Sequence, residues 1–249
     1  MSISNPDKEY LPNFHLKFGD LKDTPLHQGC RSGSIEIVKM LLEATTDHGK
    51  SSGSHKLDSD YLLLKNADGL TAFHLAVYYK YIHIVECFRD MVDETALQEV
   101  TSTKDSVHNE TPLIYAISKG YDTSFIQILA SISDLNVSSK YTGSESIHFS
   151  IGNSRNYAAP PLVVAASRND IEVVKVLLLL DIDINQLNDR GLTAISVAAK
   201  NGYADLCELL ASHGADLMLT KLRGGAPMQR ARRYKHWNVV EILEKYGAT

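Results

Sequence analysis

The feature that most constrains the fold is a segment that recurs at intervals of 33 residues in the C-terminal half of the chain. Residues 160–177 align without a gap with residues 193–210, and a third copy occupies residues 226–243. Shorter versions of the same frame begin upstream near residues 24, 71 and 111. Self-similarity at a fixed period of this size is typical of architectures in which stacked units share one core. We therefore expect six copies in one continuous structure.

Each copy predicts a pair of short helices. A threonine opens four of the copies, where its hydroxyl can cap a helix N-terminus; these are Thr24, Thr71, Thr111 and Thr193. A glycine follows nine residues later at Gly33, Gly120 and Gly202, where a helix that ends in left-handed geometry favours glycine. Apolar residues then recur at helical spacing and predict a second helix. One such pair cannot bury its apolar face alone, so neighbouring copies must pack together.

The frames Thr24-Pro-Leu-His27 and Thr71-Ala-Phe-His74, together with the period of 33, resemble the ankyrin-repeat family and its T-P-L-H-x-A signature. The resemblance covers about Leu21 to Ala248. It implies an all-α solenoid of stacked helix-turn-helix units with hairpin loops, formed by residues 21–249 after an N-terminal segment of residues 1–20. It also implies that His27 and His74 are structural residues that form hydrogen bonds within their repeats.

Three connections are longer than the repeat requires. Residues 45–61 are rich in serine, glycine and charge, and we expect a mobile loop there. Residues 138–158 form a second insertion, which contains enough apolar residues to fold back on the solenoid. Residues 92–106 are expected to add one or two helical turns. The last copy places Arg232, Arg233 and Lys235 where the other copies have small residues, which indicates a terminal cap.

The composition favours a water-soluble chain in a reducing compartment. Its net charge is −5, yet residues 221–249 hold seven Lys/Arg and two Glu, so the C-terminal end is basic. No apolar run is long enough to span a bilayer, and residues 1–23 do not resemble a secretory signal. The three cysteines are widely spaced and odd in number. We expect an intracellular, cytoplasmic protein and a monomer, and delivery into a host cell by a pathogen remains an alternative.

The sequence lacks the usual catalytic and nucleotide-binding motifs, so we expect no enzyme activity, no cofactor and no metal site. Two alternatives remain open. An enzyme could have a site in the inserted loops, where Glu145 and His148 are the one plausible acid–base pair. The basic C-terminal repeat could instead bind nucleic acid, although no nucleic-acid-binding motif accompanies it.

The resemblance implies that a partner protein binds the hairpin tips and the concave surface of the first helices. The corresponding positions are the eighth and ninth places of each frame and the residues just before it. Tyrosine and arginine are enriched at interface hot spots, and the basic end favours a partner with an acidic segment. The predicted partner-binding residues are Arg31, Asp68, Tyr78, Tyr79, Lys119, Tyr157, Arg168, Arg190, Lys200, Arg223, Arg233 and Tyr234.

Overall fold

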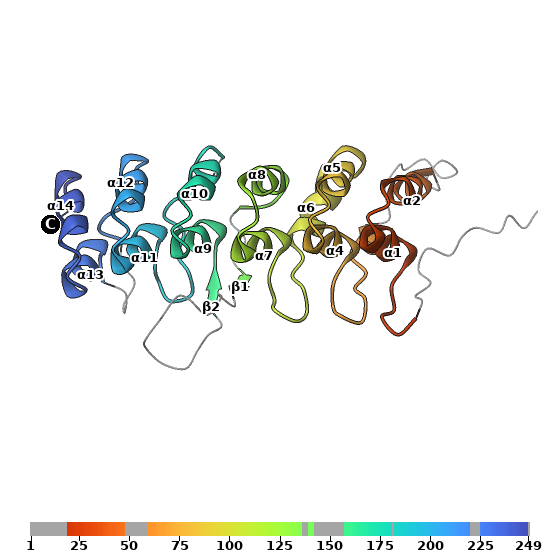
Figure 1. Ribbon diagram of the computed structural model, residues 1–249, viewed down its shortest axis with the longest axis horizontal. Coiled ribbons are helices and arrows are strands. Elements are labelled where there is room, and N and C mark those ends of the chain that lie inside the picture. Colours follow the sequence, from red (N-terminus) through yellow and green to blue (C-terminus); the bar gives the residue numbers. More distant parts are fainter. Residues whose placement is uncertain are drawn as a thin grey trace, which may run out of the picture.

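The computed structural model describes residues 19–47, 59–135, 139–141, 157–180, 182–219 and 225–248. Most of its helices form two parallel rows (Figure 1). The first row contains α1 (Pro25–Ser32), α4 (Ala72–Tyr78), α7 (Pro112–Lys119), α9 (Pro161–Ser167), α11 (Ala194–Asn201) and α13 (Pro227–Arg233). The second row contains α2 (Ile35–Asp47), α5 (Ile82–Met91), α8 (Thr123–Ser131), α10 (Ile171–Leu178), α12 (Ala204–Ser212) and α14 (Trp237–Lys245). The predicted all-α solenoid of six helix pairs is confirmed.

The first-row helices begin and end as their sequences predict. Thr24, Thr71, Thr111 and Thr193 are N-caps whose hydroxyls accept a hydrogen bond from the backbone three residues later. The glycines that end α1, α7 and α11 adopt positive φ angles of 74°, 67° and 78°. A side chain other than glycine is strained in this left-handed region. The turn after each of these helices therefore depends on glycine.

The two signature histidines close the first turns of their helices, and His27 also links two repeats. His27 Nδ1 accepts from the backbone N–H of Thr24, and its Nε2 donates to the carbonyl oxygen of Leu70 in the next repeat, at 3.0 Å. His74 Nδ1 likewise accepts from the Thr71 N–H at 3.3 Å. Burial of His74 lowers its pKa to about 4, so its ring is neutral near pH 7. The structural role expected for both histidines is confirmed.

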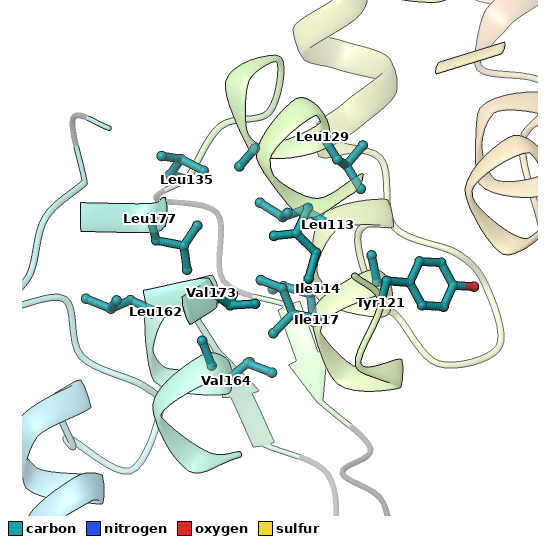
Figure 2. Packing of buried hydrophobic residues seen from close by; sticks show 14 of the residues in the cluster. Leu113, Ile114, Ile117, Tyr121, Leu129, Leu135, Leu162, Val164, Val173 and Leu177 are labelled. Carbon is teal, nitrogen blue, oxygen red and sulfur yellow. The ribbon is translucent and has the colours of Figure 1, made fainter. Parts of the chain in front are cut away.

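The core runs between the two rows and passes from one repeat to the next. Figure 2 shows this packing where repeats 3 and 4 meet: Ile114 and Ile117 of α7 lie opposite Val164 of α9 and Val173 of α10. All four side chains are at most 1% exposed. Because each repeat covers the apolar face of its neighbour, stability is shared along the solenoid.

Connecting loops extend from one side of the first row (Figure 1), and we call them finger loops. Three of them are residues 66–70, 105–110 and 188–192. In each loop, one side chain accepts hydrogen bonds from backbone N–H groups of the same loop. Asn66 accepts from Asp68 and Leu70, and Asn188 accepts from Arg190 and Leu192. These bonds fix the loops that the family resemblance assigns to partner binding.

The first two insertions differ in kind. The extra residues after α5 form helix α6 (Glu94–Ser102), which confirms the predicted helical turns. The loop predicted at residues 45–61 is wrong at both edges, because α2 continues to Asp47 and α3 (Ser59–Leu62) begins before the loop was expected to end. Tyr61 is 2% exposed, and its hydroxyl accepts from the Leu26 N–H at 3.3 Å. Residues 48–58 lie outside the described residues.

The insertion at 138–158 begins and ends in a short antiparallel pair. Strand β1 (Ser139–Tyr141) pairs with β2 (Tyr157–Ala159), and Ser139 lies opposite Ala159. The folding back predicted for residues 138–158 can be followed only at the ends of this insertion, where β1 contacts α7, and residues 142–156 lie outside the described residues. In the parts of the chain that are described, no helix is long and apolar enough to cross a membrane.

Candidate functional site

The predicted binding residues fall mainly at the C-terminal ends of the first-row helices, which lie side by side in Figure 1. The structure divides them into two groups at opposite ends of the solenoid, with Arg168 between them. One group is aromatic and spans repeats 1 to 3. The other is cationic and spans repeats 5 and 6.

The aromatic group forms a continuous surface, which we call the tyrosine surface and define as Arg31, Tyr78, Tyr79, Tyr115 and Lys119. Tyr78 stacks on Tyr115 with ring centroids 5.6 Å apart, and it meets Tyr79 edge-on at 5.2 Å. Arg31 Nη1 donates to the Tyr79 hydroxyl at 3.2 Å, and Lys119 Nζ lies 5.4 Å from the Tyr115 ring centroid. Tyr78 is 50% exposed and Tyr79 39%, so the surface combines fixed geometry with accessible aromatic area.

A buried carboxylate orients one end of this surface. Arg31 Nε donates to Asp23 at 2.9 Å, and Asn66 Nδ2 donates to the same carboxylate at 2.8 Å. Burial by itself would raise the pKa of Asp23, but the hydrogen bonds from Arg31 and Asn66 outweigh it and lower the pKa. Arg31 Nη2 also lies 3.9 Å from Asp68, which the sequence placed in the binding set. Arg31, Asp68, Tyr78 and Tyr79 are thus brought together.

A pocket of about 90 Å³ opens beside this surface, between the finger loops of repeats 2 and 3. Tyr78 and Tyr115 form part of its wall, with Leu70, Val77 and Pro112 adding apolar area. A water molecule occupies about 30 Å³ in the liquid, so the volume suits about three waters or one small side chain. The pocket can therefore accept a single apolar group from a partner.

Arg168 is bound into the scaffold. Its Nη1 donates to the carbonyl oxygen of Ser118 in the preceding repeat at 2.8 Å, and its side chain is half-buried. A Cβ at Gly120 would lie 2.5 Å from Nη2 of Arg168. Arg168 thus binds the C-terminal end of α7. Its replacement alters the contact between repeats 3 and 4 as well as the candidate binding surface.

The cationic group, which we call the cationic cluster, consists of Arg190, Lys200, Arg230, Arg233 and Tyr234. Lys200 Nζ lies 5.6 Å from the centroid of the Tyr234 ring. Burial, followed by the charges of Arg230 and Arg190, lowers the pKa of Lys200 to about 8. Arg233 is exposed and adds its charge to that of Arg230. An anionic group placed next to these cations would be attracted to them.

Several predicted residues cannot be placed. Arg223 lies outside the described residues, and so do Glu145 and His148, the pair considered for an enzyme. Tyr157 is the first residue of strand β2, but its side chain lies outside the described set.

Cys30, Cys87 and Cys207 are free and buried, and burial raises their pKa values, which leaves the thiols protonated near pH 7. Within the described residues, no group of three or more His, Cys, Asp or Glu side chains is arranged to hold a metal ion.

The sequence reasoning missed the fifth place of the repeat frame. Tyr115 and Arg230 both occupy it, and each completes one of the two groups. Residues three and four apart on a helix share a face, so the fifth place lies beside the eighth and ninth. Helical spacing alone could have added both residues to the predicted set.

Family models agree with the repeat architecture at both ends of the chain. A model described as ankyrin repeats (3 copies) matches residues 162–249, and a model for a single ankyrin repeat matches residues 21–48. A putative ankyrin repeat protein of Borreliella burgdorferi is 30% identical over 89 residues, which span 36% of this chain and 41% of the relative. The chain thus matches less than half the length of that relative.

Solved structures match most of the chain. An ankyrin repeat domain from Acinetobacter baumannii gives a TM-score of 0.64 at 24% identity and covers 90% of this chain and 98% of its own. The ankyrin repeat domain of Bcl-3, described as a unique member of the IkappaB protein family, gives a TM-score of 0.64 at 22% identity, with 91% and 87% covered. At these identities the likeness concerns the fold. The repeated frame, the two helix rows and these matches together identify the chain as an ankyrin-repeat protein.

Proposed function

We propose that this protein binds a partner protein through the first-row helix ends and finger loops, with the tyrosine surface and the cationic cluster as its two contact regions. Ankyrin-repeat solenoids are protein-interaction modules, and the chain has this architecture. The partner lies along the row in an extended conformation. It places an apolar side chain in the pocket beside Tyr78 and acidic side chains against the cationic cluster.

The observation that carries this proposal is the gathering of Arg190, Lys200 and Arg230, where burial first, and then the two arginine charges, lower the pKa of Lys200 to about 8. An acidic side chain brought next to these cations would favour the charged form of Lys200. The cluster lies at the same helix ends as the tyrosine surface, so one partner can reach both along the row. Tyrosine and arginine are also the residue types that dominate interface energetics.

The experiment is an affinity capture from a eukaryotic lysate, followed by measurement of the affinity of the captured protein for purified variants. Arg190→Glu/Arg233→Glu removes two positive charges from the cluster and adds two negative ones. Arg168 is left intact because it joins two repeats. We expect capture by the wild type, loss of binding in the double variant, and weaker binding as salt screens the charges.

Lys39→Glu/Lys175→Glu provides the matched control. Both lysines are exposed and lie away from the cationic cluster, on second-row helices α2 and α10. The change in net charge is the same as in the cluster variant. Equal losses of affinity in the two double variants would show that the change in net charge explains the loss of binding. That result would contradict the proposed site.

A further inference from the structure

Helix α6 lies outside the two rows of repeat helices. It follows α5 in the chain, lies between α5 and α7 in the view of Figure 1, and contacts α3 and α7. A cleft of about 870 Å³ lies along it. The other walls are the end of α5, residues 130–135 at the end of α8, and Leu180 just after α10. The cleft thus borders the second-row helix ends, whereas the tyrosine surface lies on the first row.

The cleft has an apolar lining held by the core. Val92, Leu97, Ala130 and Leu135 all contribute to it, and none of them is more than 7% exposed. Leu180 adds a half-buried apolar side chain at one edge. The adjoining Leu179 is 82% exposed. A ligand in the cleft would therefore meet an ordered apolar floor and could cover an exposed leucine beside it.

The electrostatics of the cleft are negative. Glu94, Glu99 and Asp134 line it, and its arginine, Arg89, already pairs with Asp90 at 2.9 Å. Three helices, α5, α8 and α10, also end at the cleft. The C-terminal end of a helix carries a partial negative charge of about half an elementary charge, which favours a cation nearby. The carboxylates and these three helix ends therefore act in the same direction, and the Asp93 carboxylate caps the N-terminal end of α6, the one helix that begins at the described cleft.

We propose that this cleft is a second docking surface, which binds a basic segment of a partner protein. One apolar side chain of the segment rests on Leu97 and Val92, and flanking lysine or arginine side chains meet Glu94, Glu99 and the ends of α5 and α8. The segment is a ligand of opposite charge to the one proposed for the cationic cluster. An ankyrin-repeat chain with both surfaces can hold an acidic and a basic partner segment at once.

A synthetic probe tests the proposal without knowledge of the partner. The probe is a fluorescein-labelled peptide in which one leucine is flanked on each side by two lysines and a terminal glycine. Fluorescence anisotropy measures its affinity for the full chain. We expect binding that weakens with salt, and about tenfold weaker binding for a peptide with glycine in place of leucine, because that side chain no longer buries apolar area.

Glu94→Lys/Glu99→Lys reverses the charge of α6, and Asp205→Lys/Glu241→Lys is the matched control. Glu94 and Asp205 each lie in the first turn of a helix, and all four residues are exposed. We expect the first pair to weaken probe binding by at least about tenfold and the control pair to leave it unchanged. Circular dichroism melting of both variants verifies that they fold.

Two results would overturn the proposal. One is equal affinity of the probe for both double variants, or for the leucine and glycine peptides, which would reduce the binding to general charge attraction. The other is self-association of the chain that is abolished by Glu94→Lys/Glu99→Lys and also by Arg233→Glu. That result would mean that a second copy of the chain occupies the cleft. The variants described under the proposed function change no residue of this cleft, so each proposal can fail by itself.

Discussion

The ring of Tyr81 lies over Gly33, the glycine that ends the first helix of the preceding repeat. A Cβ at Gly33 would lie 2.8 Å from this ring. The same relationship recurs at the other end of the chain, where a Cβ at Gly202 would lie 2.6 Å from Nδ1 of His236. His236 Nε2 also donates to the carbonyl oxygen of Lys200 at 3.0 Å. Each of these glycines therefore allows the turn that ends its own helix and leaves room for a ring of the next repeat.

Replacing Gly33 with alanine is expected to destabilise the protein by about 2–3 kcal/mol, because the new methyl group adds a clash with Tyr81 to the cost of a positive φ angle. Gly214→Ala is the matched control. Gly214 has a φ angle of 84° with no heavy atom within 4 Å of the added Cβ. Its replacement carries the backbone cost alone, about 1 kcal/mol. Urea unfolding measures both, and equal losses would show that the ring does not constrain Gly33.

The buried His74 predicts a loss of stability in mild acid. Its pKa is about 4 in the folded protein, below the ordinary value of 6.5. Protonation therefore favours the unfolded chain. The contribution of His74 to the free energy of unfolding is complete above pH 6.5 and falls as the pH drops toward 4. Linkage gives a loss of about 2 kcal/mol between pH 7.5 and 5.

His74→Ile isolates this effect, since repeat 3 carries Ile114 at the same place of its frame. Urea unfolding at the two pH values should show a smaller difference for the variant than for the wild type. The exposed histidine His213 provides the control, and His213→Gln should retain the full difference. An unchanged pH dependence in His74→Ile would contradict a neutral buried ring.

Lys200 predicts how binding depends on alkaline pH. Its pKa is about 8 in the free protein because of burial and the charges of Arg230 and Arg190. An acidic partner segment favours the protonated amine, so partner affinity should fall as the pH rises through about 8. Calorimetry in buffers of different ionisation enthalpy should detect proton uptake on binding near this pH. Lys200→Met should lose the uptake, and the same uptake in that variant would exclude Lys200 as its source.

Tyr78→Ala tests the aromatic region. Tyr78 is half-exposed and packs against Tyr79 and Tyr115, so its removal should cost little stability, about 1 kcal/mol. At a hot spot the same change weakens binding by about 2 kcal/mol or more. The comparison is Trp237→Ala, which removes a 60% exposed aromatic side chain from second-row helix α14. Unchanged partner affinity in Tyr78→Ala would remove the tyrosine surface from the interface.

The sequence predicts the helix pairs well because the threonine caps, the terminal glycines and the apolar spacing all act locally. Tyr61 shows where this reasoning stops. It follows a stretch rich in serine and glycine, yet its hydroxyl meets Leu26 across 35 positions of sequence. Contacts between distant residues of this kind leave no local pattern in the chain.

Arg168 illustrates the same limit at the candidate site. Its place in the frame predicts an exposed binding residue, but only the neighbouring repeat supplies the Ser118 carbonyl that it binds. Tyr115 differs from Arg168. Its position at the fifth place of the frame can be read from the sequence, but its stacking on Tyr78 cannot. The grouping of residues from different repeats into two surfaces emerges only when the repeats are stacked.

The most direct test of the proposed binding role compares the affinity of the captured partner for the wild type, Arg190→Glu/Arg233→Glu and Lys39→Glu/Lys175→Glu at low and moderate salt. The account predicts that the cluster variant loses binding, that the control variant keeps the wild-type affinity, and that salt weakens the wild-type complex. Wild-type affinity in the cluster variant at both salt concentrations would contradict partner binding through this face.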